Sequence, residues 1–209
     1  MMSLCCEIIT SGDCGVSPAV VILHHNLNDV VMDKKLTIWG AAGFVVLYFV
    51  AVFAAEFVGF LHPVCWVLAP ALGALLAAIP WRWLAVRWHG FGLGTTLAAV
   101  FGLLMLAMGE FDLLRLAFCV AFGLLSDLVR LAVKRDGVAY PVLALGNMAN
   151  IVYLWTRKAW YLEGAAEECG QAYADAMAPL QNALWLVIAV AAVVVLAEVG
   201  LWISKRIIK

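Results

Sequence analysis

Long apolar runs dominate the chain, and short polar stretches separate them. A helix that crosses a membrane needs about 20 mainly apolar residues. The runs close to this size cover residues 38–61, 64–79, 91–109, 113–133, 138–156 and 183–204. None of them alternates polar and apolar positions with the period of two that a barrel strand shows. The pattern therefore predicts an all-α, polytopic membrane protein with six transmembrane helices.

Composition strengthens this prediction. Hydrophobic residues make up 66% of the chain and charged residues 13%, and the mean hydropathy is +1.01. A water-soluble core of 209 residues is too small to hide that much apolar surface, so we expect most of it to contact the lipid bilayer. The net charge of -1 argues against a nucleic-acid partner.

The six cysteines form no C-x-x-C pair. Neither a disulfide framework nor a zinc site is therefore expected, and the sequence predicts no metal and no cofactor.

The positions of the basic residues predict the orientation in the membrane. Lys and Arg in short loops near helix ends mark the cytoplasmic side. Ten of the thirteen bases fall on one side of the predicted topology, namely Lys34, Lys35, Arg82, Arg87, Arg130, Lys134, Arg135, Lys205, Arg206 and Lys209. The other side holds Arg115, Arg157 and Lys158 among several acids. We therefore expect a multi-pass protein of the cell membrane with both termini in the cytoplasm.

The stretch LLSDLVRLAVKRDG, residues 124–137, concentrates charge at the end of the fourth run. Asp127 and Arg130 lie three residues apart on one helix face, which is close enough to pair. Lys134 and Arg135 would mark the membrane surface. We interpret the stretch as a stop and orientation signal, and a docking role for a cytoplasmic partner is the alternative.

The first 33 residues differ from the remainder, because their only apolar patch is short. They lack the basic start, apolar centre and small-residue exit of a secretory signal. Met32 is followed by DKKLT, which resembles a natural start. We expect residues 1–33 to be a disordered leader or the product of a misassigned start, and residues 34–209 to form the membrane domain.

The largest predicted loop, residues 158–181, lies on the outer side. Its sequence EGAAEECGQAYADAMA is rich enough in Ala and Glu to form a short helix. This helix could close over an outward-facing pocket as a lid. A solvated surface helix without any gating role is the alternative, since many loops only connect.

Motifs of catalysis are absent from the sequence. The chain has no GxxxxGK[ST] phosphate loop, no HExxH and no GxSxG. The glycines of GFGLG, residues 90–94, lack the spacing of a dinucleotide loop and instead suit close helix packing. The chain is therefore not expected to be an enzyme.

Polar residues recur at a similar depth in the outer half of the predicted bundle. An ionisable group inside the bilayer costs about 3 kcal/mol unless it has a partner or a wet cavity. Glu56 is therefore a binding-site candidate, and an internal pair with Arg115 is its alternative. Asn147 and Asn150 share a helix face, where they either contact a ligand or bond between helices. The candidate substrate-binding residues are Glu56, His62, Trp66, Glu110, Arg115, Asn147, Asn150 and Tyr153.

Small residues recur every four positions on the first predicted helix. Ala51, Ala55 and Gly59 would let another helix approach its backbone closely. This small-residue seam is either internal to the bundle or a docking face for a partner.

Several segments together resemble the Trep_Strep group of integral membrane proteins. They are KKLTIWGAAGFVVLYFVAVF, LAPALGALLAAIPW, GFGLGTTLAAVFGLLMLAMG, GLLSDLV and GQAYADAMA, and the resemblance covers residues 34–209. Where this group leads us to expect prolines in the fifth helix, the chain reads LGNMANIVYLW. The group is regarded as substrate-binding S components of energy-coupling factor (ECF) transporters. In such S components the first helix docks through small residues, which match Ala51 and Ala55.

The resemblance implies an S-component-like bundle that works with a membrane coupling subunit and two cytoplasmic ATPases. Its substrate would be a small nutrient, vitamin-like or tetrapyrrole-like, captured outside the cell. The alternatives are a membrane scaffold or enzyme subunit without a transported ligand, and a stand-alone secondary transporter. The last lacks support, because the sequence shows no repeated halves.

Overall fold

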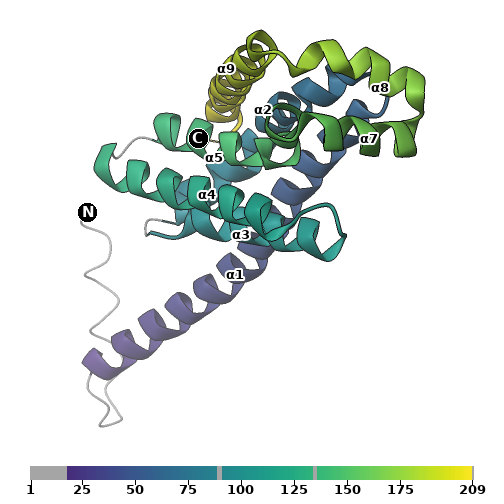
Figure 1. Ribbon diagram of the computed structural model, residues 1–209. Helices are drawn as coiled ribbons and strands as arrows, with labels where there is room; N and C mark the ends of the chain where they lie inside the picture. The colour runs from purple at the N-terminus through teal and green to yellow at the C-terminus, as the bar shows by residue number, and fades with distance from the viewer. Residues whose placement is uncertain (1–17, 89–90, 134–135, 209) are drawn as a thin grey trace. The chain divides into compact units, whose positions relative to one another are not determined.

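The computed structural model describes residues 18–88, 91–133 and 136–208, with side chains from Trp39 onward except that of Asp136 (Figure 1). All regular elements in these ranges are helical, which confirms the predicted all-α class. The chain divides into two compact units, 1–41 and 42–209. The first helix, α1 (Pro18–Gly59), begins in the first unit and ends in the second. Residues 18–33 of the predicted leader belong to α1, whereas residues 1–17 lie outside the described residues, so the interpretation of residues 1–33 as a leader stays a prediction.

Four described helical segments are long and apolar enough to cross a membrane. They are Trp39–Gly59 of α1, α2 (Pro63–Arg87), α4 (Leu113–Val133) and α9 (Ala183–Ile207). A fifth apolar helix, α3 (Leu93–Ala107), is shorter. The structure thus shows a helical membrane protein with four such spans, and the predicted number of six stays a prediction.

The fifth apolar run is not the single helix that its pattern predicts. It forms α5 (Asp136–Gly146), a 3-10 turn η1 (Asn147–Asn150) and the short α6 (Tyr153–Thr156). Both ends of η1 are asparagines whose amides bond to α1, at Tyr48 and Glu56. These two bonds fix the segment against α1, and asparagine is a weak helix former, which together give a physical reason for the break.

The second run is longer than predicted. The predicted run ends at Ile79, but α2 continues through Pro80 to Arg87. Arg82 and Arg87 therefore lie in the last turns of this helix, and their predicted position in a loop is wrong. Proline is tolerated inside membrane helices where neighbouring groups satisfy the freed backbone.

Glycine contacts hold the helices of the second unit close together. A methyl group added at Gly123 of α4 would lie 2.6 Å from Cβ of Ala98 on α3, and one at Gly94 of α3 would lie 2.8 Å from the Gly123 carbonyl. A methyl group added at Gly200 of α9 would lie 2.7 Å from Cβ of Ala78 on α2. The helix packing predicted from GFGLG is thus confirmed at Gly94 but not at Gly92, where an added methyl group would meet nothing within 4 Å; Gly90 lies outside the described residues.

The acid and base of the predicted stop signal connect neighbouring helices. Asp127 of α4 accepts hydrogen bonds from the backbone N–H groups of Gly94 and Thr95 and from the Thr95 hydroxyl, at 2.6–2.9 Å. It thereby caps the N-terminus of α3. Arg130 donates to the carbonyls of Ala85 and Trp88 at the end of α2, at 2.6 and 2.7 Å.

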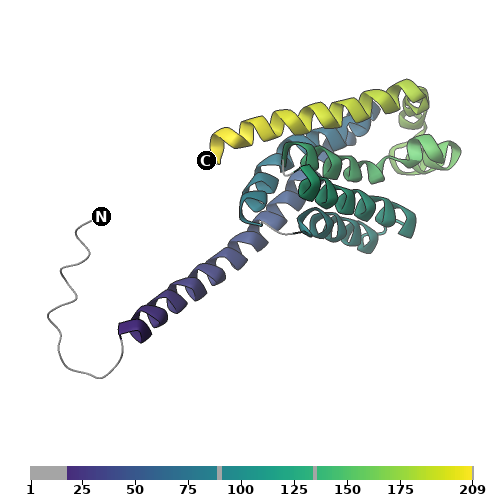
Figure 2. The ribbon, with the colours of Figure 1, turned by 90° about the vertical axis from the view of Figure 1, so that its left-hand side faces the viewer.

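The predicted loop at residues 158–181 forms two helices, α7 (Lys158–Cys169) and α8 (Gln171–Met177), followed by a 3-10 turn, η2 (Ala178–Gln181). Gly170 separates α7 from α8 with φ of 92°, a conformation that favours glycine. Both helices lie across the end of the unit where α2 and α9 begin, and α8 contacts α2 (Figure 2). A helix in this segment is therefore confirmed, and its role as a lid stays a prediction.

Candidate functional site

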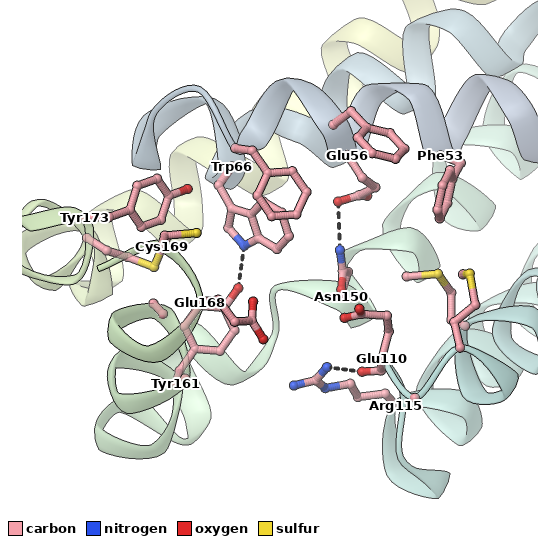
Figure 3. A pocket seen from close by; sticks show the side chains of 18 of the residues that line it. Phe53, Glu56, Trp66, Glu110, Arg115, Asn150, Tyr161, Glu168, Cys169 and Tyr173 are labelled. Carbon is pink, nitrogen blue, oxygen red and sulfur yellow. Dashed lines mark hydrogen bonds between the residues drawn. The ribbon is translucent and has the colours of Figure 1, made fainter. Parts of the chain in front are cut away.

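A cavity of about 490 Å³ lies beneath α7 and α8 (Figure 3). Residues of α1, α2, α3, α4, η1, α7 and α8 line it, together with residues of the α1–α2 and α3–α4 connections. Its volume falls in the range of about 300–1,000 Å³ that is usual for small-molecule sites. Membrane helices thus form its walls, and α7 and α8 contribute residues on the side away from the bundle.

Glu56 of α1 is the most enclosed acid in the cavity wall. Its side chain is 5% exposed, and its Oε2 accepts a hydrogen bond of 2.7 Å from Nδ2 of Asn150 (Figure 3). Its other oxygen, Oε1, is buried without a hydrogen-bond partner. Glu56 therefore takes Asn150 as its partner, and the alternative pair with Arg115 does not form. A buried acceptor of this kind carries a desolvation cost until a donor reaches it.

Arg115 of α4 is the basic residue in the cavity wall. Its guanidinium donates a hydrogen bond of 2.6 Å to the main-chain carbonyl of Glu110 and lies 4.2 Å from the centre of the Tyr153 ring. The Trp160 ring is 5.6 Å away. The side chain is only 7% exposed, and its Nε is buried without a partner. Backbone and ring contacts therefore hold Arg115 in place, and its Nε–H group remains without a hydrogen-bond acceptor.

Asp112 supports Arg115 from outside the cavity. Its carboxylate accepts from the Arg115 backbone N–H at 2.9 Å and from the Tyr153 hydroxyl at 2.5 Å. Burial acts to raise the pKa of Asp112, but these hydrogen bonds and the charges of Arg115 and Arg157 outweigh it, so the pKa lies below its ordinary value. The ionised Asp112 thus fixes the start of α4 and the ring on which Arg115 lies.

Aromatic rings form much of the remaining wall. Phe53 and Phe57 lie on α1 and Phe60 directly follows its end, and Phe60 meets Trp66 edge to face with ring centres 5.3 Å apart. The indole N–H of Trp66 donates to the Tyr161 hydroxyl of α7 (Figure 3).

Tyr173 of α8 provides a second contact between the covering helices and the bundle. Its hydroxyl donates to the Gly59 carbonyl of α1 at 2.9 Å. Burial, aided by the nearby Cys169 and Cys65 thiols, raises the pKa of Tyr173 to about 12, so the phenol keeps the proton that it donates. With the Tyr161 contact, this bond attaches both covering helices to the walls of the cavity.

Five of the predicted site residues line the cavity, namely Glu56, Trp66, Glu110, Arg115 and Asn150. The other three lie outside it. His62 caps α2, where its Nδ1 accepts from the Val64 backbone N–H at 3.2 Å. Asn147 donates to the Tyr48 hydroxyl at 3.4 Å, and Tyr153 lies behind Arg115. That any of the eight residues binds a ligand stays a prediction.

The sequence reasoning missed most of the aromatic wall. Phe53, Phe57 and Phe60 flank Glu56 at intervals of four and three residues, and this spacing was the available signal. Trp160 and Tyr161, whose residue types are also common at the membrane surface, line the cavity as well. The other lining residues without a predicted role are Met105, Met108, Gly109, Gly164, Ala165, Glu168, Cys169, Tyr173 and Met177.

The small-residue seam of α1 is largely internal. Ala55 is fully buried and packs near Gly73 of α2. Gly59 is so close to Trp66 that an added methyl group would lie 2.4 Å from the indole. The internal alternative therefore applies to Ala55 and Gly59, whereas Ala51 is half-buried and keeps some free surface.

No curated protein and no solved structure matches this chain. Residues 41–209 match the family model described as "Hypothetical bacterial integral membrane protein (Trep_Strep)", which covers most of the chain. The arrangement of apolar helices agrees with an integral membrane protein. The chain therefore belongs to the Trep_Strep family of bacterial integral membrane proteins.

Proposed function

We propose that this protein is the substrate-binding S component of an ECF-type importer in the cell membrane. It captures a small nutrient outside the cell and passes it to partner subunits for ATP-driven uptake. The observation that carries the proposal is the cavity between the membrane helices and α7–α8, in which Glu56 Oε1 is buried without a partner. A cavity with a few convergent polar groups and many apolar ones is typical of a small-molecule site.

The energy for uptake would come from other subunits. The sequence contains no phosphate-binding loop, so ATP hydrolysis is assigned to two cytoplasmic ATPases and force transmission to a membrane coupling subunit. A scaffold would need no solute cavity, and a stand-alone transporter would need no ATPase.

Among vitamin-like and tetrapyrrole-like substrates, a haem bound through His62 loses support, because this residue caps α2 and does not line the cavity.

Copurification tests the proposal directly. The tagged protein, solubilised from its native membrane, should carry the coupling subunit and both ATPases with it. Because Ala51 keeps free surface on α1, Ala51→Leu should reduce this recovery, whereas Ala191→Leu, at an exposed position of α9, should not. Solute uptake that continues after deletion of the ATPase genes would contradict the proposal.

The proposed orientation predicts that the covering helices face outward. Cys169 is exposed and lines the cavity, so a membrane-impermeant maleimide should label it in whole cells. The experiment uses a chain in which only Cys169 and the buried Cys119 remain. Burial and the neighbouring Glu168 raise the pKa of the Cys169 thiol, so labelling requires mildly alkaline pH.

The matched control for this labelling carries its exposed thiol at the opposite end. In a Cys169→Ser background, Gly137→Cys should react only after the cells are opened, since the orientation places the start of α5 in the cytoplasm. Labelling of Gly137→Cys but not of Cys169 in intact cells would reverse the proposed topology.

A further inference from the structure

The charges that line the cavity are mainly negative. Glu56, Glu110 and Glu168 supply three carboxylates, and Arg115 is the one base among the lining residues. The guanidinium of Arg115 donates to the Glu110 carbonyl and lies over the face of Tyr153, while its Nε is without a partner. One base does not balance the negative charge of three carboxylates. The cavity therefore favours a positively charged occupant.

The aromatic lining favours the same kind of occupant for an independent reason. Seven lining residues carry aromatic rings, namely Phe53, Phe57, Phe60, Trp66, Trp160, Tyr161 and Tyr173. The face of an aromatic ring is electron-rich and attracts a cation that lies over it. Flat rings also stack on other flat, unsaturated groups. The cavity therefore suits a cation that is part of, or attached to, a planar body.

The unpartnered oxygen of Glu56 indicates that the cation must carry a hydrogen-bond donor. Oε1 of Glu56 is buried and unpartnered, while Oε2 is held by Asn150. In Figure 3 the Glu56 carboxylate points toward Asn150, with Phe53 and Trp66 on either side. A protonated nitrogen would supply both the donor and the charge that this oxygen lacks.

A bare metal ion fits the cavity less well than an organic cation. No group of three or more His, Cys, Asp or Glu side chains within the described part of the chain is placed to hold a metal ion. Hard divalent cations take six or more oxygen ligands, whereas the lining here is mostly aromatic.

We propose that the cavity binds a small organic cation in which a protonated nitrogen is attached to a flat, unsaturated body. The nitrogen donates to Glu56 Oε1, and the planar body lies between the phenylalanines of α1 and the Trp66–Tyr161 pair. This inference rests on the proposed function, because it specifies the solute that the uptake subunit captures.

Three probes of nearly equal shape test the inference. They are 2-naphthylmethylamine, which is a cation at neutral pH, the neutral 2-naphthalenemethanol and the anion 2-naphthoate. Binding is measured by equilibrium dialysis of the detergent-purified full chain against protein-free micelles. The amine should bind at least about tenfold more tightly than the alcohol, as one charge-assisted hydrogen bond implies. The carboxylate probe should bind most weakly.

Variants of the lining acids identify the responsible group. Glu56→Gln keeps the shape of the side chain and should weaken amine binding about tenfold while leaving alcohol binding unchanged. Glu168→Gln, at an exposed position of the lining, should give a smaller loss for the amine and keeps the test valid if Glu56→Gln does not fold. Glu163→Gln is the matched control, because Glu163 is exposed on α7 and does not line the cavity.

Equal binding of amine and alcohol would overturn the inference, as would an amine affinity that neither Glu56→Gln nor Glu168→Gln changes. Failure of all three probes to bind would overturn it as well. Copurification with the coupling subunit and ATPases does not depend on any probe, so it decides the proposed function separately.

Discussion

Asp127→Ala should lower the unfolding temperature of the detergent-solubilised protein more than any other single replacement of a described carboxylate by alanine. The side chain is 1% exposed and accepts three hydrogen bonds from the first residues of α3. Its loss leaves the buried Gly94 donor and the two partly buried Thr95 donors without this acceptor, at a cost of about 3 kcal/mol or more. The carboxylate also lies at the positive end of the α3 dipole, which adds to the loss.

The control for this substitution is an acid on the surface. Asp175→Ala removes a carboxylate that accepts one exposed hydrogen bond of 2.8 Å from Gln171, and it should change the free energy of unfolding by about 0.5 kcal/mol or less. Asp127→Asn retains one acceptor oxygen and should fall between the two. If Asp127→Ala melts like Asp175→Ala, the cap of α3 does not hold the bundle together.

Trp66→Ala should remove most of the solute binding of the purified protein. The indole lies against Phe60 and donates a hydrogen bond to Tyr161. Its loss therefore enlarges the cavity and removes this hydrogen bond between α2 and α7. Removing a central aromatic residue from a binding site costs about 2 kcal/mol or more, which is roughly a thirtyfold loss of affinity.

Two variants separate the role of Trp66 in binding from a general effect on folding. Tyr161→Phe keeps the ring and removes only the acceptor of the indole N–H, so it should cause a smaller loss. Trp202→Ala removes an exposed indole of α9 that lies under the Arg206 guanidinium, and it should leave binding unchanged. Equal losses in Trp66→Ala and Trp202→Ala would show that the cavity wall is not specifically involved.

Helix boundaries were predictable where polar residues interrupt the apolar pattern. The predicted fourth run matches α4, because Asp112 precedes it and charged residues follow it. The pattern failed at Pro80, since a proline inside a membrane helix does not end it when neighbouring groups accept the altered backbone. It also failed at Asn147–Asn150, where bonds to α1, distant in sequence, stabilise the break.

The polar part of the candidate site was predictable for a different reason. Charged and amide groups are costly inside a bilayer, so Glu56, Arg115 and Asn150 stand out in any apolar run. The aromatic part was not, because a phenylalanine that faces a cavity and one that faces lipid look the same in the sequence. Packing of separate helices places Phe53 in the cavity wall and leaves Val50, one turn earlier, exposed.

If the cavity beneath α7 and α8 holds a small solute, mass spectrometry should detect that molecule in the purified protein. Purified parent protein, Trp66→Ala and Trp202→Ala would be extracted with organic solvent, and the released small molecules compared. The parent and Trp202→Ala should release the same organic compound in near-equimolar amount, whereas Trp66→Ala should release little of it. Identical extracts from all three proteins, with no compound near equimolar amount, would contradict this expectation.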